Sequence, residues 1–231
     1  VHAQWTPKSV TVDRTAQAPT IDGVIDAVWS NVEAQAVEVP FMSETVSFND
    51  LGATFKALWD EDYIYILVEV DDDNHWNHLD AAVNSWQADK PELYFDVNEE
   101  LIDNLGPSVG GSGHYQVTPD FDPAPSNPNF FESAFVVESI GSYVYEYAVP
   151  IDSLKDDTGA SLDPMTRTSI GFDITILDLD EPGSGFGNDG NMGRINWSND
   201  AVSVVSSAAV AGESWVTMDQ AGEFIFNSFD T

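Results

Sequence analysis

The sequence predicts an all-β protein, a two-sheet antiparallel β-sandwich with one or two short helical turns. Segments with the two-residue alternation of apolar and polar side chains recur at intervals of roughly ten residues, and clusters of Gly, Pro, Asn and Asp separate them. The 231 residues show no sign of a second core, a linker or an internal repeat. We therefore expect one sandwich domain over residues 19–231, preceded by an N-terminal segment and first strand at 1–18.

The first half of the chain is predicted to contain one short helix and a series of strands. Residues 22–37 carry Ile25, Val28 and Trp29 at helical spacing, which indicates a short amphipathic helix. An acidic turn at 60–62 separates two runs rich in β-branched and aromatic residues, which indicates a hairpin. The predicted strands of this half are 8–12, 53–59, 63–70, 92–96 and a short one at 114–118.

The second half is predicted to complete the two sheets. One helical turn is expected at 150–157, and a glycine-rich loop at 182–193. The predicted strands of this half are 133–138, 143–149, 170–177, 194–197 and 223–229.

The charge balance limits the classes of partner. Forty acidic residues face seven basic ones, a formal net charge of −33. Such a field repels phosphate backbones and anionic lipid headgroups, so we expect no nucleic-acid partner. No apolar run approaches the ~20 residues of a membrane span, so no membrane insertion is expected either. Neutral sugars, cations and basic proteins remain possible partners. A saline environment or many bound cations would reduce the repulsion among the acidic side chains.

The first residues are consistent with export. Val1-His2-Ala3 before Gln4 fits the small-x-small ending of a signal peptide, although an arbitrary start of the chain fits equally well. The chain contains no cysteine, which excludes disulfides and thiolate metal sites but not secretion. We expect a secreted, extracellular bacterial protein.

The chain has seven tryptophans; Trp5 lies in a terminal segment and is not assigned, and the other six divide into core and surface candidates. Trp29 lies in the apolar register of the predicted helix, and Trp59 follows Leu58 on a predicted strand, so both are assigned to the core. Trp197 ends a strand and is also interpreted as packing.

Two other tryptophans are surrounded by polar residues and are interpreted as sugar-binding. Trp86 lies between Ser85 and Gln87, just before a predicted strand. Trp215 lies between Glu213-Ser214 and Val216-Thr217. A flat aromatic ring can stack on the apolar C–H face of a sugar while polar groups at the rim bind its hydroxyls. The alternative is that either ring covers a loop core. Trp76, in an Asn- and His-rich stretch, is a third candidate.

Polar side chains near these rings are predicted to bind hydroxyl groups. Alternation over 92–96 places Leu93 and Phe95 inward and Glu92 on the opposite face with Tyr94. A carboxylate such as Glu92 can accept hydrogen bonds from a pair of sugar hydroxyls, although an ordinary solvated carboxylate is the competing interpretation. Neutral contacts are expected from the next predicted strand, from Gln116 and Thr118.

Two acidic segments, 71–74 and 178–191, are predicted to bind calcium, because calcium takes six to eight oxygen ligands. Their spacing does not match an EF-hand, and solvated acidic turns are the alternative. His75 and His78 are expected to be exposed to solvent. The candidate ligands are Asp71, Asp72, Asp73, Asp178, Asp180, Asn188 and Asp189.

Seven segments, in order, resemble carbohydrate-binding module family 9. They are 21–29 (IDG, Asp26 and Trp29), 57–65 (ALWDEDYIY), 86–96 (WQAD and ELYFD), 143–150 (YVYEYAVP), 170–174 (IGFDI), 195–198 (INWS) and 221–224 (AGEF). The resemblance implies a jelly-roll-like sandwich, bound calcium, and a sugar held between two tryptophans at the positions of Trp86 and Trp215. It also implies attachment to, or association with, a glycoside hydrolase. The chain departs from the family pattern in 97–113 and 199–213, and it offers Gln116 where family members tend to offer arginine.

The predicted function is therefore a non-catalytic module that targets an enzyme or a cell to a polysaccharide or oligosaccharide. Close carboxylate pairs carry no information in so acidic a chain, and no nucleophile elbow, Walker loop or zinc-protease motif is present, so no enzyme is expected. The rival is a structural or assembly subunit of a bacterial surface layer or filament, self-assembling through the small apolar run 201–210. A haem-binding relative would need Met and His ligands, and none are convincingly paired.

Overall fold

A computed structural model describes most of the chain. The described residues are 6–41, 46, 50–75, 88–98, 103–119, 131–139, 141–180, 192–202 and 212–230. Within them, the strands are β1 Ser9–Arg14, β2 Gln35–Val37, β3 Val39–Pro40, β4 Leu51–Trp59, β5 Tyr63–Asp72, β6 Lys90–Asp96, β7 His114–Val117, β8 Glu132–Ser139, β9 Ser142–Pro150, β10 Ser169–Leu179, β11 Met192–Asn196 and β12 Gly222–Asp230. Two short 3-10 helices, η1 Ala27–Asn31 and η4 Ile151–Ser153, complete the elements.

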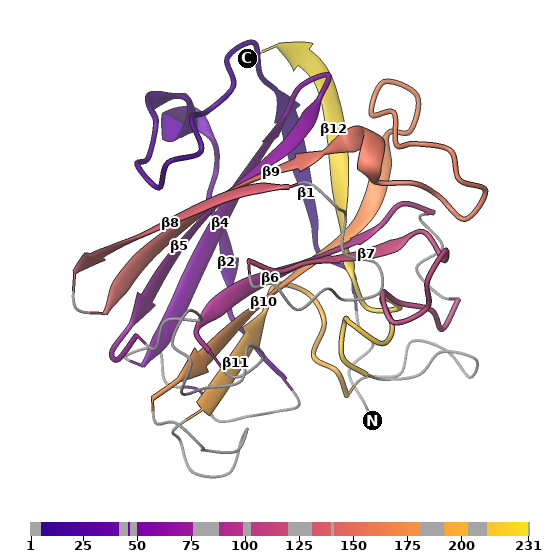
Figure 1. Cartoon of the computed structure of the whole chain (residues 1–231). Helices are drawn as coiled ribbons and strands as arrows, with labels where there is room; N and C mark the ends of the chain where they lie inside the picture. Colours follow the sequence, from indigo (N-terminus) through magenta and orange to yellow (C-terminus); the bar gives the residue numbers. More distant parts are fainter. Residues whose placement is uncertain are drawn as a thin grey trace.

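The strands form two crossing layers (Figure 1). One layer has the strand order β4-β5-β9-β8, and β2 pairs with β4. In the other layer, β6 lies between β7 and β10. The other edge of β10 pairs with both β11 and β12. The two layers are linked by β1, which pairs in parallel with both β12 and β4. The β-sandwich and the helical turn after Pro150 are confirmed, and the pairs made by β1 are the exception to antiparallel order.

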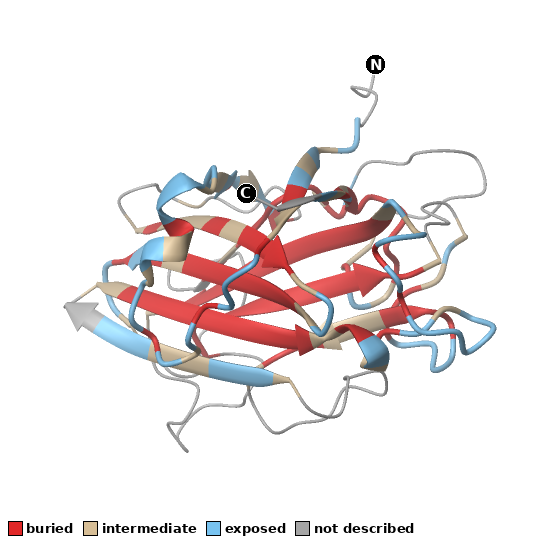
Figure 2. Cartoon of the chain, turned by 90° about the horizontal axis from the view of Figure 1, so that it is seen from above, coloured by how far each residue is buried: buried red, intermediate tan, exposed pale blue. Residues whose placement is uncertain are grey.

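Aromatic and branched side chains from both layers meet between the sheets. Phe55 of β4 lies 5.3 Å, edge-on, from the ring of Trp197, and Phe172 of β10 stacks on Phe224 of β12 at 3.8 Å. Buried residues occupy most of the strands, and exposed residues gather in the surrounding loops (Figure 2). Trp29, Trp59 and Trp197 are each at most 1% exposed, which confirms their assignment to the core.

The predicted helix over 22–37 is wrong. Only η1 is helical, and residues 35–37 pair with β4 as β2. The buried Glu146 carboxylate accepts hydrogen bonds from the backbone N–H of Asp22 (3.1 Å) and Gly23 (2.8 Å), and Gly23 adopts φ +81°, which fixes a turn where the helix was expected. Ile25, counted as part of the apolar face, is 39% exposed. Tertiary contacts override the local periodicity here.

Candidate functional site

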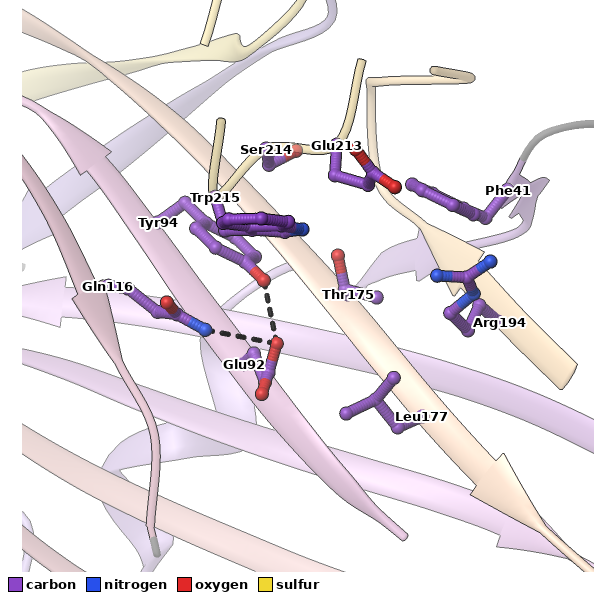
Figure 3. Close-up of a pocket in the computed structure, with 10 residues that line it drawn as sticks. All are labelled: Phe41, Glu92, Tyr94, Gln116, Thr175, Leu177, Arg194, Glu213, Ser214 and Trp215. Carbon is purple, nitrogen blue, oxygen red and sulfur yellow. Dashed lines mark hydrogen bonds between the residues drawn. The ribbon is translucent and has the colours of Figure 1, made fainter. Parts of the chain in front are cut away.

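A cavity of about 360 Å³ opens on the outer face of the β6 layer (Figure 3). Its size lies within the range of about 300–1,000 Å³ that is usual for small-molecule sites. The lining residues come from four neighbouring strands, a turn and the end of β3. They are Phe41, Glu92, Tyr94, Gln116, Thr175, Leu177, Arg194, Glu213, Ser214 and Trp215.

Strand register builds the floor of this cavity. Across β7, β6, β10 and β11, the facing pairs are Gln116 with Tyr94, Glu92 with Thr175, and Leu177 with Arg194. Facing residues on one side of a sheet lie close enough for their side chains to interact. Since the intervening residues point into the core, these side chains must point to the outer face, and together they form a continuous mixed surface.

Glu92 is the centre of the polar part of the floor. Its Oε2 accepts hydrogen bonds from the Tyr94 hydroxyl (2.7 Å) and from Gln116 Nε2 (3.2 Å), and its Oε1 lies 3.2 Å from the Lys90 ammonium. Burial raises the pKa of Tyr94 well above its usual value, so this hydroxyl remains a donor. Glu92 is only 8% exposed, which leaves a fixed, charge-balanced carboxylate at the cavity wall.

Two aromatic side chains flank this floor. Trp215 is 48% exposed and belongs to the turn 213–217, which closes with hydrogen bonds from Val216 N–H and Thr217 N–H to the Glu213 carbonyl (2.8 and 3.0 Å). Phe41 carries the Arg194 guanidinium over its ring, 3.8 Å from the centroid, in cation–π geometry. The cavity therefore combines an exposed indole with fixed acceptors and donors, which suits a ligand with both apolar faces and hydroxyl groups.

A second feature is an acidic cluster at one end of the sandwich, around Asp178 of β10. Three groups have ligand atoms within 4.8 Å of one another: Asp72, His75 and Asp89; Asp50, Asp73 and Asp180; and Asp72, Asp178 and Asp180.

Asp178 is a buried carboxyl group of this cluster whose charge is poorly stabilised by its surroundings. It is 1% exposed, and within the described part of the chain neither of its oxygens has a hydrogen-bond partner. Burial, followed by repulsion from Asp72, Asp89, Asp180 and Asp50, raises its pKa to about 9. Gathered carboxylate oxygens with unpaired, buried lone pairs fit a hard cation such as calcium.

The sequence pattern of the carbohydrate family 9 binding domain-like family matches residues 21–217. The chain belongs to this family.

The family 9 assignment agrees with the comparisons to known proteins. Endo-1,4-beta-xylanase A of Thermoanaerobacterium saccharolyticum is 31% identical over 184 residues, and exoglucanase XynX of Acetivibrio thermocellus is 29% identical over 182; each match covers 78% of this chain and 14% of the relative. A family 9 module from Caldicellulosiruptor kristjanssonii has the same fold: its glucose complex gives a TM-score of 0.66 at 20% identity, covering 96% of this chain and 97% of that one. Its cellotriose complex gives 0.65 at 20% identity, covering 96% and 95%.

The structure brings together three of the residues predicted to bind sugar in this family 9 domain. Glu92, Gln116 and Trp215 line one cavity. Thr118 follows β7, is 3% exposed and does not line it. Trp86 and Trp76 lie outside the described residues.

The predicted metal ligands are placed in a similar way. Asp72, Asp73, Asp178 and Asp180 join the acidic cluster, whereas Asn188 and Asp189 lie outside the described residues. His78, expected to be exposed to solvent, also lies outside them. Asp71 takes no part in the cluster, because it lies within β5 on the face opposite to Asp72; Asp73 does, because it follows the end of the strand, where the alternation stops.

The expected exposure of His75 is wrong. Its side chain is 8% exposed, with Nδ1 3.3 Å from Asp89 Oδ2 and its ring 4.3 Å from that of Tyr143. These partners come from β6 and β9 or their ends, and local composition does not reveal such contacts between distant segments.

Other residues of the two sites come from distant segments and were not predicted from the sequence. Arg194, Phe41 and Thr175 enter the cavity, and Asp50 and Asp89 enter the acidic cluster. Asp50 could have been found from the predicted hairpin, because Asp50 precedes the β4 residue that pairs with Asp72. In the structure, the Asp50 carbonyl accepts a hydrogen bond from Asp73 N–H (3.1 Å).

Proposed function

We propose that this chain binds uncharged oligosaccharide in the cavity beside Trp215 and does not cleave it. The observation that carries the proposal is the half-exposed indole of Trp215 at a cavity where Glu92 is already oriented by Tyr94, Gln116 and Lys90. Two solved family 9 structures hold glucose and cellotriose, which supports a glucose-type ligand here.

Each part of the cavity has a chemical role in this proposal. Trp215 stacks on the apolar face of a sugar ring, and the free lone pairs of Glu92 accept hydrogen bonds from its hydroxyls. Gln116 and Arg194 supply donors from the two sides of the floor. Trp86 is the proposed second stacking ring, on the resemblance of its segment to the family pattern.

The proposed cellular role is to hold a partner enzyme, or the cell, on an extracellular polysaccharide. The chain spans 14% of the length of the xylanase and exoglucanase relatives, which is consistent with a module of a longer hydrolase. Among the described residues, no helix is long and apolar enough to cross a bilayer. The rival assembly role depends on 201–210, of which 203–210 lie outside the described residues.

We also propose that calcium occupies the acidic cluster and stabilises the fold. Asp72, Asp178 and Asp180 would hold it, with Asp50, Asp73 and Asp89 close by. A bound cation would offset the repulsion between these carboxylates and displace the proton that a pKa of about 9 places on Asp178 near neutral pH. Its role would therefore be structural, at a place apart from the sugar cavity.

Replacing Trp215 by alanine should weaken oligosaccharide binding about ten- to a hundredfold, because one stacking face is lost. Calorimetric titration with glucose, cellotriose and xylo-oligosaccharides measures this. Met165→Ala is the matched control, since Met165 is also an exposed apolar side chain (59%) but does not line the cavity. Equal affinity of Trp215→Ala and wild type would rule out the proposed cavity. If the wild type shortens the oligosaccharides during the titration and Glu92→Gln does not, the proposal that the protein does not cleave sugar is wrong.

A further inference from the structure

We infer that Asp173, which does not line the sugar cavity, is a positioning residue that fixes the turn carrying Trp215. The inference rests on the proposed sugar-binding function of Trp215. Asp173 lies on the outer face of β10, opposite Tyr94 of β6, and is completely buried. It is thus next to the cavity floor but beneath the segments that lead to Trp215.

Within the described part of the chain, Asp173 accepts hydrogen bonds from the next residue of β10, from residues 198–199 and from Ser214, which precedes Trp215. Oδ1 accepts from the N–H of Ile174 (2.9 Å) and of Ser198 (3.0 Å). Oδ2 accepts from Asn199 N–H (3.2 Å) and from the Ser214 hydroxyl (3.0 Å). Burial raises the pKa of Asp173 to about 6, so the carboxylate is ionised and a full acceptor near neutral pH.

These bonds anchor the residues just before Trp215. Asn199, held by Asp173, donates through Nδ2 to the Ser214 hydroxyl (3.1 Å) and to the Gly212 carbonyl (2.9 Å). Asp173 and Asn199 together therefore fix both 212 and 214, and Ser214 is directly bonded to Trp215 in the chain. The Asp173 carboxylate thus attaches the start of the turn 213–217 to β10.

The other side of the turn is tied to a different loop. Ser108 N–H donates to the Trp215 carbonyl (3.0 Å), and Met218 N–H donates to the Leu105 carbonyl (2.9 Å). Because the indole of Trp215 is 48% exposed, the protein encloses only about half of it, and its direction depends strongly on the position of its backbone. A backbone that is already fixed in the free protein loses less conformational entropy when the ligand binds, and this favours binding.

Asp173→Asn keeps the side-chain shape but replaces one acceptor with a donor, which faces the donors of Asn199 or Ser198. We expect cellotriose affinity to fall about three- to tenfold, and the indole N–H NMR signal of Trp215 in the free protein to shift or broaden. Glu146→Gln is the matched control: Glu146 is also a fully buried carboxylate that accepts two backbone N–H groups, but from the loop at 22–23. It should lower stability and leave both readouts unchanged.

Ser214→Ala leaves Asp173 in place and removes the hydroxyl that joins Asp173 and Asn199 to the turn, so it is the second variant to measure if Asp173→Asn does not fold. Because Ser214 lines the cavity, its loss could also remove a contact with sugar; such a contact would leave the Trp215 signal of the free protein unchanged. Wild-type affinity and an unchanged Trp215 signal in both variants would overturn the inference. If the wild type binds no sugar, the proposed function fails, while the Trp215 signal of the free protein still decides the role of Asp173.

Discussion

Trp59→Ala should lower the free energy of unfolding by about 3–5 kcal/mol, the usual range for removing a buried aromatic side chain. Trp59 is 1% exposed, and its ring centroid lies 5.8 Å from that of Phe226. Its Nε1–H lies 3.1 Å from the carbonyls of Val12 in β1 and Asn227 in β12, where the two layers are linked. The substitution leaves a cavity and also removes the buried donor shared by these carbonyls.

Urea unfolding followed by circular dichroism measures this loss. Trp215→Ala is the control, because a half-exposed side chain outside the core should change stability by no more than about 0.5 kcal/mol. Equal losses for the two variants would contradict the division of the tryptophans into core and ligand-binding residues.

Removal of calcium should lower the melting temperature by roughly 5–10 °C. A cation at a hundred times its dissociation constant contributes about 2.7 kcal/mol, and 1 kcal/mol corresponds to about 2–4 °C in a domain of this size. Millimolar calcium should restore the melting temperature, whereas a monovalent salt at equal ionic strength should not.

Asp178→Asn separates calcium binding from simple charge screening. In chelator, this variant should melt at or above the wild-type temperature, because a buried carboxyl with no partner among the described residues is replaced by a neutral amide. Its response to calcium should be smaller than that of the wild type. If metal analysis shows that chelation has removed all calcium and the wild-type melting temperature is unchanged, the proposed site is wrong.

The sequence predicted the features that depend on local alternation. The strand at 92–96 has Leu93 and Phe95 in the core and Glu92 on the outer face, as the period of two requires. The hairpin across 60–62 is present as β4 and β5. The predicted helix over 22–37 is absent because Glu146, more than a hundred positions away in the sequence, accepts hydrogen bonds from the backbone at 22–23 and fixes a turn there.

The candidate site was only partly predictable for the same reason. Trp215 and Glu92 stood out because a large ring in a polar stretch and a carboxylate on an outer strand face are local observations. Arg194 meets Leu177 only through the pairing of β11 with β10, and Phe41 reaches Arg194 only because β3 pairs with β11. Such register cannot be assigned from separate segments when several strands share the same pattern.

The most direct test of sugar binding beside Trp215 is the indole N–H NMR signal of Trp215 during a cellotriose titration, assigned with Trp215→Phe. We predict that this signal shifts saturably, with the same dissociation constant as calorimetry, while the signals of the buried Trp29 and Trp59 stay in place. Saturable calorimetric binding of cellotriose with an unmoved Trp215 signal would contradict the assignment of the cavity as the sugar-binding site.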